Sequence, residues 1–586
     1  MKKTKMICTV GPASGSVETI KDLINAGMDA SRHNFSHGDH QEHKERIDKV
    51  KQVRKEMNRH IAIILDTKGP EIRTGNFLAG KVELQEGSKF TVVCGEEVIG
   101  DETICSVTYE ELYKDVKAGD TILIDDGLVG LTVESVEGKK VHCVVANTGM
   151  VGNHKGVNVP GVAINLPALT ARDIGDLKFG CEIGVDFIAA SFVRKASDVL
   201  HIRRVLNENG GEKVQIISKV ENQEGVDNID DIIKLSDAVM VARGDLGVEI
   251  PTEEVPIVQK MMIAKCNAAG KAVITATQML DSMIRNPRPT RAESSDVANA
   301  IFDGTDAIML SGETANGKYP VEAATIMAKI AQTAENALNY KENLKNKGAV
   351  HIPNVPNAIS LATCTTAMEL NASAIITATQ SGNTARKVSA YRPECPVIAV
   401  TPYEVVARSL ALNWGVISIC ADKIESTDKL IDNSVAIALE SGYVQKGDLV
   451  VIAAGIPANF VGSTNMMKVH IVGDILLQGK GNISASACGT ACFAKNAKEA
   501  NETMRDGDIL VVKELTKEYT NLLDRVSGII VEEDATRSDV VVEGTSKAVP
   551  IIYNAIGAVD IIKTGSFITM DAARGIVYSG RANVKN

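Results

Sequence analysis

Short runs of apolar, β-branched residues alternate with stretches whose apolar positions recur every three or four residues through the first 340 residues. The short runs predict β-strands and the longer stretches predict amphipathic helices. The predicted strands cover residues 5–10, 29–36, 61–67, 186–193, 214–222, 238–246, 272–279 and 307–313. Eight strand–helix units in series predict an α/β fold built on a (β/α)8 TIM barrel, with an open doubly wound sheet as the alternative.

The alternation is interrupted between the third and fourth strands, from about Gly69 to Pro167. Short strand-like runs broken by Gly, Asn and Asp predict a small β-barrel there, placed where it could act as a lid. From about residue 340, strand-like and helical runs alternate again. We therefore predict a barrel in two parts (1–69 and 168–340), an inserted lid domain (70–167), an α/β regulatory domain (341–473) and an extra C-terminal domain (474–586).

Composition narrows the class of protein. A chain of 586 residues is too long for one core, and 44% apolar with 23% charged residues is ordinary for a globular protein. A net charge of −11 disfavours nucleic acid or an anionic membrane as the main partner. The eleven cysteines are scattered in apolar runs, and no apolar run approaches the roughly 18 residues of a membrane span. These features predict a cytoplasmic protein with buried, reduced thiols.

Polar residues interrupt the predicted strands near their carboxyl ends. Lys219 and Glu221 are two residues apart in the fifth strand, so both would point into the barrel. The same spacing recurs in three other strands, in Arg32, Asn34 and Ser36, in Arg243 and Asp245, and in Thr275 and Thr277. Because the active site of such a barrel lies at this end, we expect these groups to converge.

The chemistry of the set is specific. Glu221 and Asp245 suit a hard divalent cation that also takes water and substrate oxygens as ligands. The nearby cations suit a phosphoryl group, and they are Arg32, Lys68, Arg73 and Lys219. From the residues alone we predict a Mg²⁺-dependent enzyme that acts on a phosphorylated or enolisable oxyacid.

Four stretches resemble the pyruvate kinase family: "ISKVENQEG", "MVARGDLGVEI", "DTKGPEIRTG" and the long run from "ITATQMLDSM" to "LSGET". The resemblance covers about residues 1–473 in order. It implies transfer of the phosphoryl group of phosphoenolpyruvate to ADP, giving pyruvate and ATP in the final step of glycolysis. It also implies a homotetramer that is regulated allosterically.

The resemblance assigns residues to the reaction. It implies that Glu221 and Asp245 hold Mg²⁺ or Mn²⁺, and that Lys219 and Arg32 neutralise the phosphoryl group. Gly244, Asp245 and Thr277 would seat the substrate carboxylate. Protonation of the enolate would run through water near Thr277 and Ser311, with Glu313 nearby, and the proton donor stays open because neither hydroxyl has a pKa suited to acid catalysis.

The same resemblance implies further binding sites. The K⁺ ligands would be Asn34, Ser36, Asp66 and Thr67, and Glu71 matches K⁺-dependent members. The nucleotide contacts would be Pro12, Asn34, His37, Arg73 and Lys155. The loop "TATQSGNTARK" resembles the family's effector loop, in which a phosphorylated small molecule would meet Thr379, Ser381, Gly382, Asn383 and Thr384. The run "GIPANFVGSTN" would form a second wall of that site.

Residues 474–586 resemble the swivelling phosphohistidine domain of phosphoenolpyruvate-utilising enzymes. That domain's motif centres on Thr-Ser-His, whereas this chain has Arg537, Ser538 and Asp539. Because the phosphorylatable histidine is missing, we predict a structural or regulatory domain rather than a phospho-carrier.

The stretch "SRHNFSHGDHQEH" contains four histidines whose spacing could suggest zinc. The second strand ends near Ser36 and a helix starts near Asp39, so the four do not share one helix face. We expect His33 to face the helix layer, where an unpartnered imidazole would cost about 1–3 kcal/mol. His40 and His43 would lie on a solvated helix.

Three other functions fit parts of this sequence. A Mg²⁺-dependent carbon–carbon lyase also pairs Glu and Asp on its metal, but it has no use for the lid. A non-catalytic scaffold conflicts with an intact set of Lys219, Glu221 and Asp245. A phospho-relay protein would need the missing histidine.

Overall fold

The computed structural model describes residues 1–349, 353–423, 427–456, 464–473 and 475–582. The chain divides into two compact units. The first comprises residues 1–357, 380–393 and 401–420, and the second comprises residues 358–379, 394–400 and 421–586.

A closed barrel of eight parallel strands forms the centre of the first unit, as predicted. Its strands are β1 (Lys5–Thr9), β2 (Ala30–Asn34), β3 (Ala62–Asp66), β13 (Phe187–Ala190), β14 (Gln215–Val220), β15 (Ala238–Ala242), β16 (Ala272–Ala276) and β17 (Ala307–Leu310). All eight are nearly or fully buried, since the strands lie between the barrel interior and an outer layer of helices.

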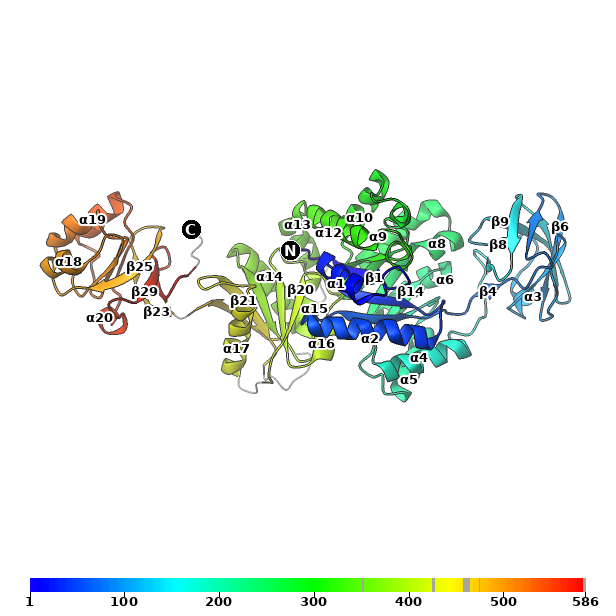
Figure 1. Cartoon of the computed structure of the whole chain (residues 1–586), viewed down its shortest axis with the longest axis horizontal. Helices are drawn as coiled ribbons and strands as arrows, with labels where there is room; N and C mark the ends of the chain where they lie inside the picture. The colour runs from blue at the N-terminus through cyan, green and yellow to red at the C-terminus, as the bar shows by residue number, and fades with distance from the viewer. Residues whose placement is uncertain (350–352, 424–426, 457–463, 474, 583–586) are drawn as a thin grey trace. The chain divides into compact units, whose positions relative to one another are not determined.

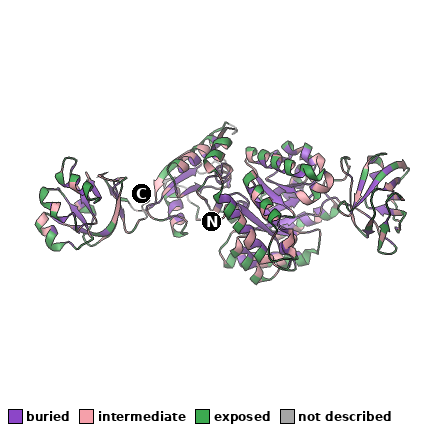
Figure 2. Cartoon of the chain, turned by 90° about the horizontal axis from the view of Figure 1, so that it is seen from above, coloured by how far each residue is buried: buried purple, intermediate pink, exposed green. Residues whose placement is uncertain are grey.

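Capping residues mark the ends of several outer helices. Thr170 and Thr290 form capping boxes at the starts of two helices, and Gly270 ends another with a left-handed φ of 67°. The barrel helices are α1 (Val17–Ala26), α2 (His40–Glu56), α4 (Ala171–Ile183), α5 (Ala196–Glu208), α6 (Gln223–Asp227), α7 (Ile229–Leu235), α8 (Arg243–Glu249), α9 (Val255–Ala269), α10 (Arg291–Asp303), α11 (Gly312–Ala315) and α12 (Pro320–Asn336). Figure 2 shows their exposed residues on the outside and the buried ones toward the strands.

The lid is a β-sheet domain with its own apolar core. Seven strands pair in the order β4-β12-β8-β9-β10-β6-β7, and a bridge between Thr74 and Val107 links the two ends of that order. The lid elements are β4 (Ile72–Arg73), β5 (Lys81–Leu84), β6 (Lys89–Cys94), β7 (Ile104–Val107), α3 (Leu112–Asp115), β8 (Thr121–Ile124), β9 (Val129–Glu137), β10 (Lys140–Val145), β11 (Gly149–Gly152) and β12 (Gly156–Asn158).

The α/β region follows α13 (Tyr340–Ala349). In it, β19, β18 and β21 pair in parallel and β22 adds an antiparallel edge that the sequence did not predict. Its elements are α14 (Val355–Glu369), β18 (Ala374–Ala378), α15 (Asn383–Ala390), β19 (Val397–Thr401), α16 (Glu404–Ser409), β20 (Val416–Cys420), α17 (Thr427–Glu440), β21 (Leu449–Ala454) and β22 (Met466–Ile471).

The C-terminal region has an eight-stranded sheet, order β23-β30-β29-β25-β26-β27-β28-β24. Its elements are β23 (Ile475–Gln478), β24 (Lys480–Gly481), β25 (Ser486–Phe493), α18 (Ala497–Thr503), β26 (Ile509–Val512), β27 (Gly528–Val531), α19 (Asp539–Ser546), β28 (Ile551–Tyr553), α20 (Ala558–Ile561), β29 (Phe567–Asp571) and β30 (Ile576–Ser579).

Two sequence features can be placed in this fold. All eleven cysteines are free thiols, and most are buried. In the described part of the chain, no helix combines the length and apolar character needed to cross a bilayer.

Candidate functional site

Lys219 and Glu221 meet at the carboxyl end of β14, as their two-residue spacing predicted. The Lys219 Nζ lies 2.9 Å from Glu221 Oε1 and 3.2 Å from Asp66 Oδ1. It also donates to Ser191 Oγ at 2.8 Å, and the Phe192 N–H donates to Glu221 Oε2 at 2.6 Å. A buried ammonium group is thus held among oxygens on three adjacent strand ends.

The charges in this cluster are coupled. Burial alone lowers the pKa of Lys219, but Asp66 and Glu221 outweigh it and the pKa is raised overall, so the amine stays charged. Burial raises the pKa of Glu221 to about 7, with Asp245 adding to the rise and Lys219 opposing it. Glu221 and Asp245 therefore repel each other when both are ionised. A cation bound between them would relieve this repulsion.

Arg32 joins the cluster through Asp66. Its Nε donates to Asp66 Oδ2 at 2.5 Å and its Nη1 donates to Thr9 Oγ1 at 3.0 Å. Asn34 stands opposite Asp66 in the register of β2 and β3. The structure therefore gathers Arg32, Lys219 and Asp66 into one buried network, with Asn34 beside it.

Thr277 has a strained backbone. It follows β16 with φ of 70°, a left-handed conformation that costs a β-branched residue of order 1–3 kcal/mol. Its hydroxyl donates to Ala276 O at 2.6 Å and accepts the Gly244 N–H at 2.7 Å. Such strain is typical of functional sites, because the surrounding structure must hold it.

The predicted extension of the sixth strand to residue 246 is wrong. β15 ends at Ala242, and Arg243 begins α8, so Arg243 and Asp245 lie on a helix. Arg243 forms two hydrogen bonds to Asp296, at 2.6 and 2.7 Å, and does not join the cluster. Asp245 does, because the helix turns it toward Lys219 and Glu221, whose pKa values it raises.

Ser311 and Glu313 lie just beyond β17. Glu313 is buried and accepts the N–H groups of Leu280 and Ser311 at 3.1 and 2.7 Å. Burial raises the pKa of its carboxyl. The Ser311 hydroxyl is buried and has no hydrogen-bond partner among the described residues.

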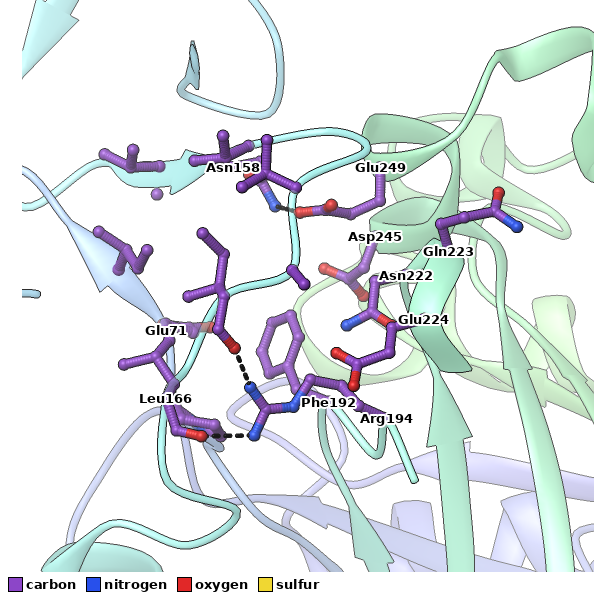
Figure 3. A pocket seen from close by; sticks show the side chains of 18 of the residues that line it. Glu71, Asn158, Leu166, Phe192, Arg194, Asn222, Gln223, Glu224, Asp245 and Glu249 are labelled. Atoms are coloured by element: carbon purple, nitrogen blue, oxygen red, sulfur yellow. Dashed lines mark hydrogen bonds between the residues drawn. The ribbon is translucent and has the colours of Figure 1, made fainter. Parts of the chain in front are cut away.

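A cavity of about 580 Å³ lies between the lid and the barrel (Figure 3). Asp245 and Phe192 line it and link it to the Lys219 cluster. From the lid side it is lined by Glu71, Arg73 and Lys155. Arg73 pairs with Glu71 at 2.6 Å, and Lys155 with Asp125 at 2.9 Å.

The other predicted site residues fall in three places. Pro12 and His37 are exposed in turns after β1 and β2. Ser36 donates its N–H to Asn34 Oδ1 at 3.1 Å, and the Thr67 hydroxyl accepts the Ser191 N–H at 3.2 Å. The effector-loop residues Ser381, Gly382, Asn383 and Thr384 form the turn and first residues of α15, with Gly382 at φ of 81°, while Thr379 follows β18. Residues 457–463 of the second wall lie outside the described part of the chain.

The histidine-rich stretch has a structural role that the sequence revealed only in part. His33 is buried, and its pKa falls to about 3 because burial disfavours the charged ring. The expectation that His43 is solvated is wrong, since it is only 2% exposed and stacks on Phe35 at 4.0 Å. His40 instead remains part-exposed and bonds Asp176 at 2.6 Å.

The sequence did not predict several residues of the site. Ser191 and Phe192 lie near the end of the run "DFIAASFV", and a polar serine in that apolar run could have indicated a site residue. The role of the Phe192 backbone N–H could not be predicted from the sequence, because it depends on a backbone φ of 56°. Across the cavity, Asn158 donates to Glu249 at 2.6 Å, and Arg194 donates to Ile164 O and Leu166 O at 2.6 and 2.5 Å (Figure 3).

Comparisons with known proteins agree with this architecture. The family model described as pyruvate kinase, barrel domain, matches residues 1–324, and that of the pyruvate kinase alpha/beta domain matches residues 357–470. The model of the mobile domain of PEP-utilising enzymes matches residues 504–575.

Curated relatives extend the likeness. A pyruvate kinase of Clostridium acetobutylicum is 67% identical over 472 residues, which span 80% of this chain and all of the relative. One from Bacillus licheniformis is 52% identical over 586 residues, the full length of both chains. A crystal structure of a pyruvate kinase from Cryptosporidium parvum, 40% identical, matches with a TM-score of 0.77 over 80% of this chain and 96% of that one.

Proposed function

The chain belongs to the pyruvate kinase family, and we propose that Lys219, Glu221 and Asp245 form the centre at which it transfers the phosphoryl group of phosphoenolpyruvate to ADP. The observation that carries this assignment is the buried Lys219 ammonium, which is kept charged by Glu221 and Asp66 at a barrel strand's carboxyl end. A fixed positive charge at that place can stabilise a phosphoryl group while it is transferred.

Pyruvate kinases are metal-dependent enzymes, and the donor set here fits Mg²⁺ or Mn²⁺ held by Glu221 and Asp245. The fit rests on two carboxylates at adjacent places in the barrel, of which Asp245 raises the pKa of the buried Glu221. Among the described residues, no group of three His, Cys, Asp or Glu side chains could hold a metal, so water and substrate would complete the shell, as Mg²⁺ prefers. When bound, the ion supplies charge stabilisation to the phosphate and enolate oxygens.

The chain's own residues account for the remaining steps. Lys219 and Arg32 bind the phosphoryl oxygens while the bond to the enol oxygen breaks and the bond to the ADP oxygen forms. Gly244 and Asp245, in the first turn of α8, would seat the substrate carboxylate together with Thr277; the Gly244 N–H, which donates to the Thr277 hydroxyl at 2.7 Å, would exchange that contact for a carboxylate oxygen. The enolate then takes a proton at carbon 3 through water beside Thr277 and Ser311, with Glu313 holding the Ser311 backbone in place.

We extend the proposal to K⁺ and nucleotide. Hard oxygen ligands from Asn34, Ser36, Asp66 and Thr67 suit K⁺, and Glu71, which pairs with Arg73, matches K⁺-dependent members of the family. The nucleotide would contact Pro12, Asn34, His37, Arg73 and Lys155. Arg73 and Lys155 support this role because they line the cavity beside Asp245.

Regulation and assembly complete the proposal. A phosphorylated effector would bind at Thr379, Ser381, Gly382, Asn383 and Thr384, the protein would be a cytoplasmic homotetramer, and the C-terminal domain would be structural or regulatory. The proposed domain boundaries are 1–69 with 168–340 for the barrel, 70–167 for the lid, 341–473 for the α/β domain and 474–586 for the C-terminal domain.

The test is a coupled assay of pyruvate formation from phosphoenolpyruvate and ADP, with and without Mg²⁺ and K⁺. Lys219→Met should lower kcat by about 1000-fold, the scale of losing a preorganised charge at a transition state. Lys265→Met, at an exposed lysine paired with Asp230, serves as the matched control and should leave kcat unchanged. Full activity in Lys219→Met would refute the assignment, whereas activity without K⁺ would refute only the K⁺ site.

A further inference from the structure

A second cavity, of about 260 Å³, lies at the opposite end of the barrel from Lys219. Its walls come from the start of β16, the end of α9, and α15 and α16. Three cationic side chains line it, Lys271, Arg386 and Lys387, against a single carboxylate, Asp237.

Asp237 is already engaged. Its Oδ2 accepts from Arg203 Nη2 and from the Ile216 N–H, both at 2.8 Å. In the part of the chain that the structure describes, no carboxylate lies within 4.0 Å of the Lys271, Arg386 or Lys387 side-chain nitrogens. The cavity wall therefore carries three cationic side chains and one carboxylate, and that carboxylate is shared with Arg203.

Arg386 is the most confined of the three cations. Its guanidinium donates to Ser381 O at 3.0 Å and to Ser409 Oγ at 2.8 Å, which uses two of its five N–H groups in the described contacts. Burial lowers its pKa, and only Asp237 opposes that change. Lys271 donates to Ser236 O at 2.7 Å, and burial lowers its pKa; Asp237 opposes that change, and Arg386 and Lys387 add to it.

A neighbouring cavity of about 300 Å³ shares Ala269, Gly270 and Lys387 with the first. Lys347 lines it together with four asparagines, and no carboxylate does. Burial, together with Arg392, lowers the pKa of Lys347 to about 7. A further lysine amine thus lies past Lys387, and burial favours its neutral form.

We propose that the cavity walled by Lys271, Arg386 and Lys387 is a binding site for a small phosphate-bearing anion. A guanidinium fork and two ammonium groups match the oxygens of a phosphate, and the amide side chains of Gln215 and Asn413, which also line the cavity, can bind the rest of a compact molecule. The site is separate from the catalytic centre. Arg386 and Lys387 belong to the stretch "TATQSGNTARK", but neither is among the residues proposed to contact the effector, and Lys271 lies outside that stretch. It does not depend on the proposed catalytic roles.

Amine labelling resolved by residue tests this site in the full-length protein. Acetylation of Lys271 and Lys387 is followed by mass spectrometry at rising inorganic phosphate, with chloride at equal ionic strength as the reference. Lys265, exposed six residues before Lys271, is the internal control. Phosphate should slow labelling of Lys271 and Lys387 several-fold relative to Lys265; equal rates with and without phosphate, or protection of Lys265 as well, would overturn the proposal.

Variants provide a second measurement on the same phosphate titration. Lys271→Met should weaken the phosphate protection of Lys387 by roughly tenfold, the scale of one charged hydrogen bond, while Lys265→Met leaves it intact. Melting curves of both variants exclude unfolding as the cause. Undiminished protection of Lys387 in Lys271→Met would place the phosphate elsewhere.

Discussion

At the scale of single residues, Ser191 holds Lys219, the lysine proposed to act in catalysis, in place. Its hydroxyl donates to Thr67 O at 2.7 Å and accepts from Lys219 Nζ at 2.8 Å, so it ties the lysine to the end of β3. Removing the Ser191 hydroxyl leaves the Lys219 ammonium charged but removes one of the contacts that fix its position. Position matters because small displacements of a reacting group cost large factors in rate.

We predict that Ser191→Ala lowers kcat for pyruvate formation by about tenfold and changes the KM for phosphoenolpyruvate less. The coupled assay measures both, and the thermal melting curve checks the fold. Ser546→Ala, on the exposed side of α19, is the control. A change in KM alone would show that Ser191 acts in substrate binding rather than in positioning Lys219.

The polar side chains in β2 and just before it differ in how completely their polar atoms are paired. Asp29 forms ion pairs with Lys2 at 2.7 Å and Lys5 at 3.5 Å, and it accepts the Met6 N–H at 2.8 Å. His33 Nε2 lies 3.2 Å from Ser31 Oγ, but its Nδ1 has no hydrogen-bond partner among the described residues. The expected cost of an unpartnered buried imidazole nitrogen therefore falls on one atom.

We predict that His33→Leu raises the free energy of unfolding by about 1 kcal/mol, since an apolar side chain removes that orphaned polar atom. Denaturant unfolding monitored by circular dichroism gives the value. His142→Leu, at a half-exposed position of the lid strand β10, should change stability by no more than about 0.5 kcal/mol. A loss of stability in His33→Leu would mean that packing of the imidazole outweighs its missing partner.

At the scale of elements, periodicity predicted the strands better than it predicted their ends. Lys219 and Glu221 could be placed on one face because the chain stays extended there. The same spacing failed for Arg243 and Asp245, because the chain enters α8 directly after Ala242. Backbone conformations such as the positive φ of Phe192 and Thr277 depend on tertiary packing, so no local pattern could reveal the N–H and hydroxyl contacts that they create.

Arg194 connects the lid's return segment to the barrel. Its guanidinium donates to the carbonyls of Ile164 and Leu166, and its side chain is 9% exposed. The residue follows β13 and precedes α5, both rigid parts of the barrel, so it fixes the point at which the lid segment rejoins the barrel.

We predict that Arg194→Met increases amide hydrogen exchange in residues 160–168 at least several-fold, because the two carbonyl contacts are lost. Exchange in β14 should stay unchanged, which separates a local effect from global unfolding. Arg203→Met, which removes a similar part-buried arginine that contacts Val214 O and Asp237, is the matched control and should not affect residues 160–168. Unchanged exchange in Arg194→Met would show that the lid segment is held by other contacts.

At the scale of the whole molecule, the C-terminal sheet is self-contained. Among the described residues, its eight strands pair only with one another, and the two apolar clusters described for it contain no residue before Leu476. The relative from Clostridium acetobutylicum is complete in 472 residues that match 80% of this chain. The cluster of Arg32, Asp66, Lys219, Glu221 and Asp245 lies at the ends of barrel strands and on α8, and among the described residues none of its contacts comes from the C-terminal sheet.

We predict that a chain ending at Gly473 folds and keeps kcat within about twofold of the full-length value, since domains with separate cores fold independently. The cut must follow β22, because that strand pairs with β21 along its whole length and Val472 is buried. A chain ending at Asn465 is the control: it exposes the edge of β21 and should melt at a lower temperature and aggregate. Loss of activity in the Gly473 chain with an unchanged melting curve would give the C-terminal domain a direct part in catalysis, and equal melting of both truncated chains would show that β22 does not protect that edge.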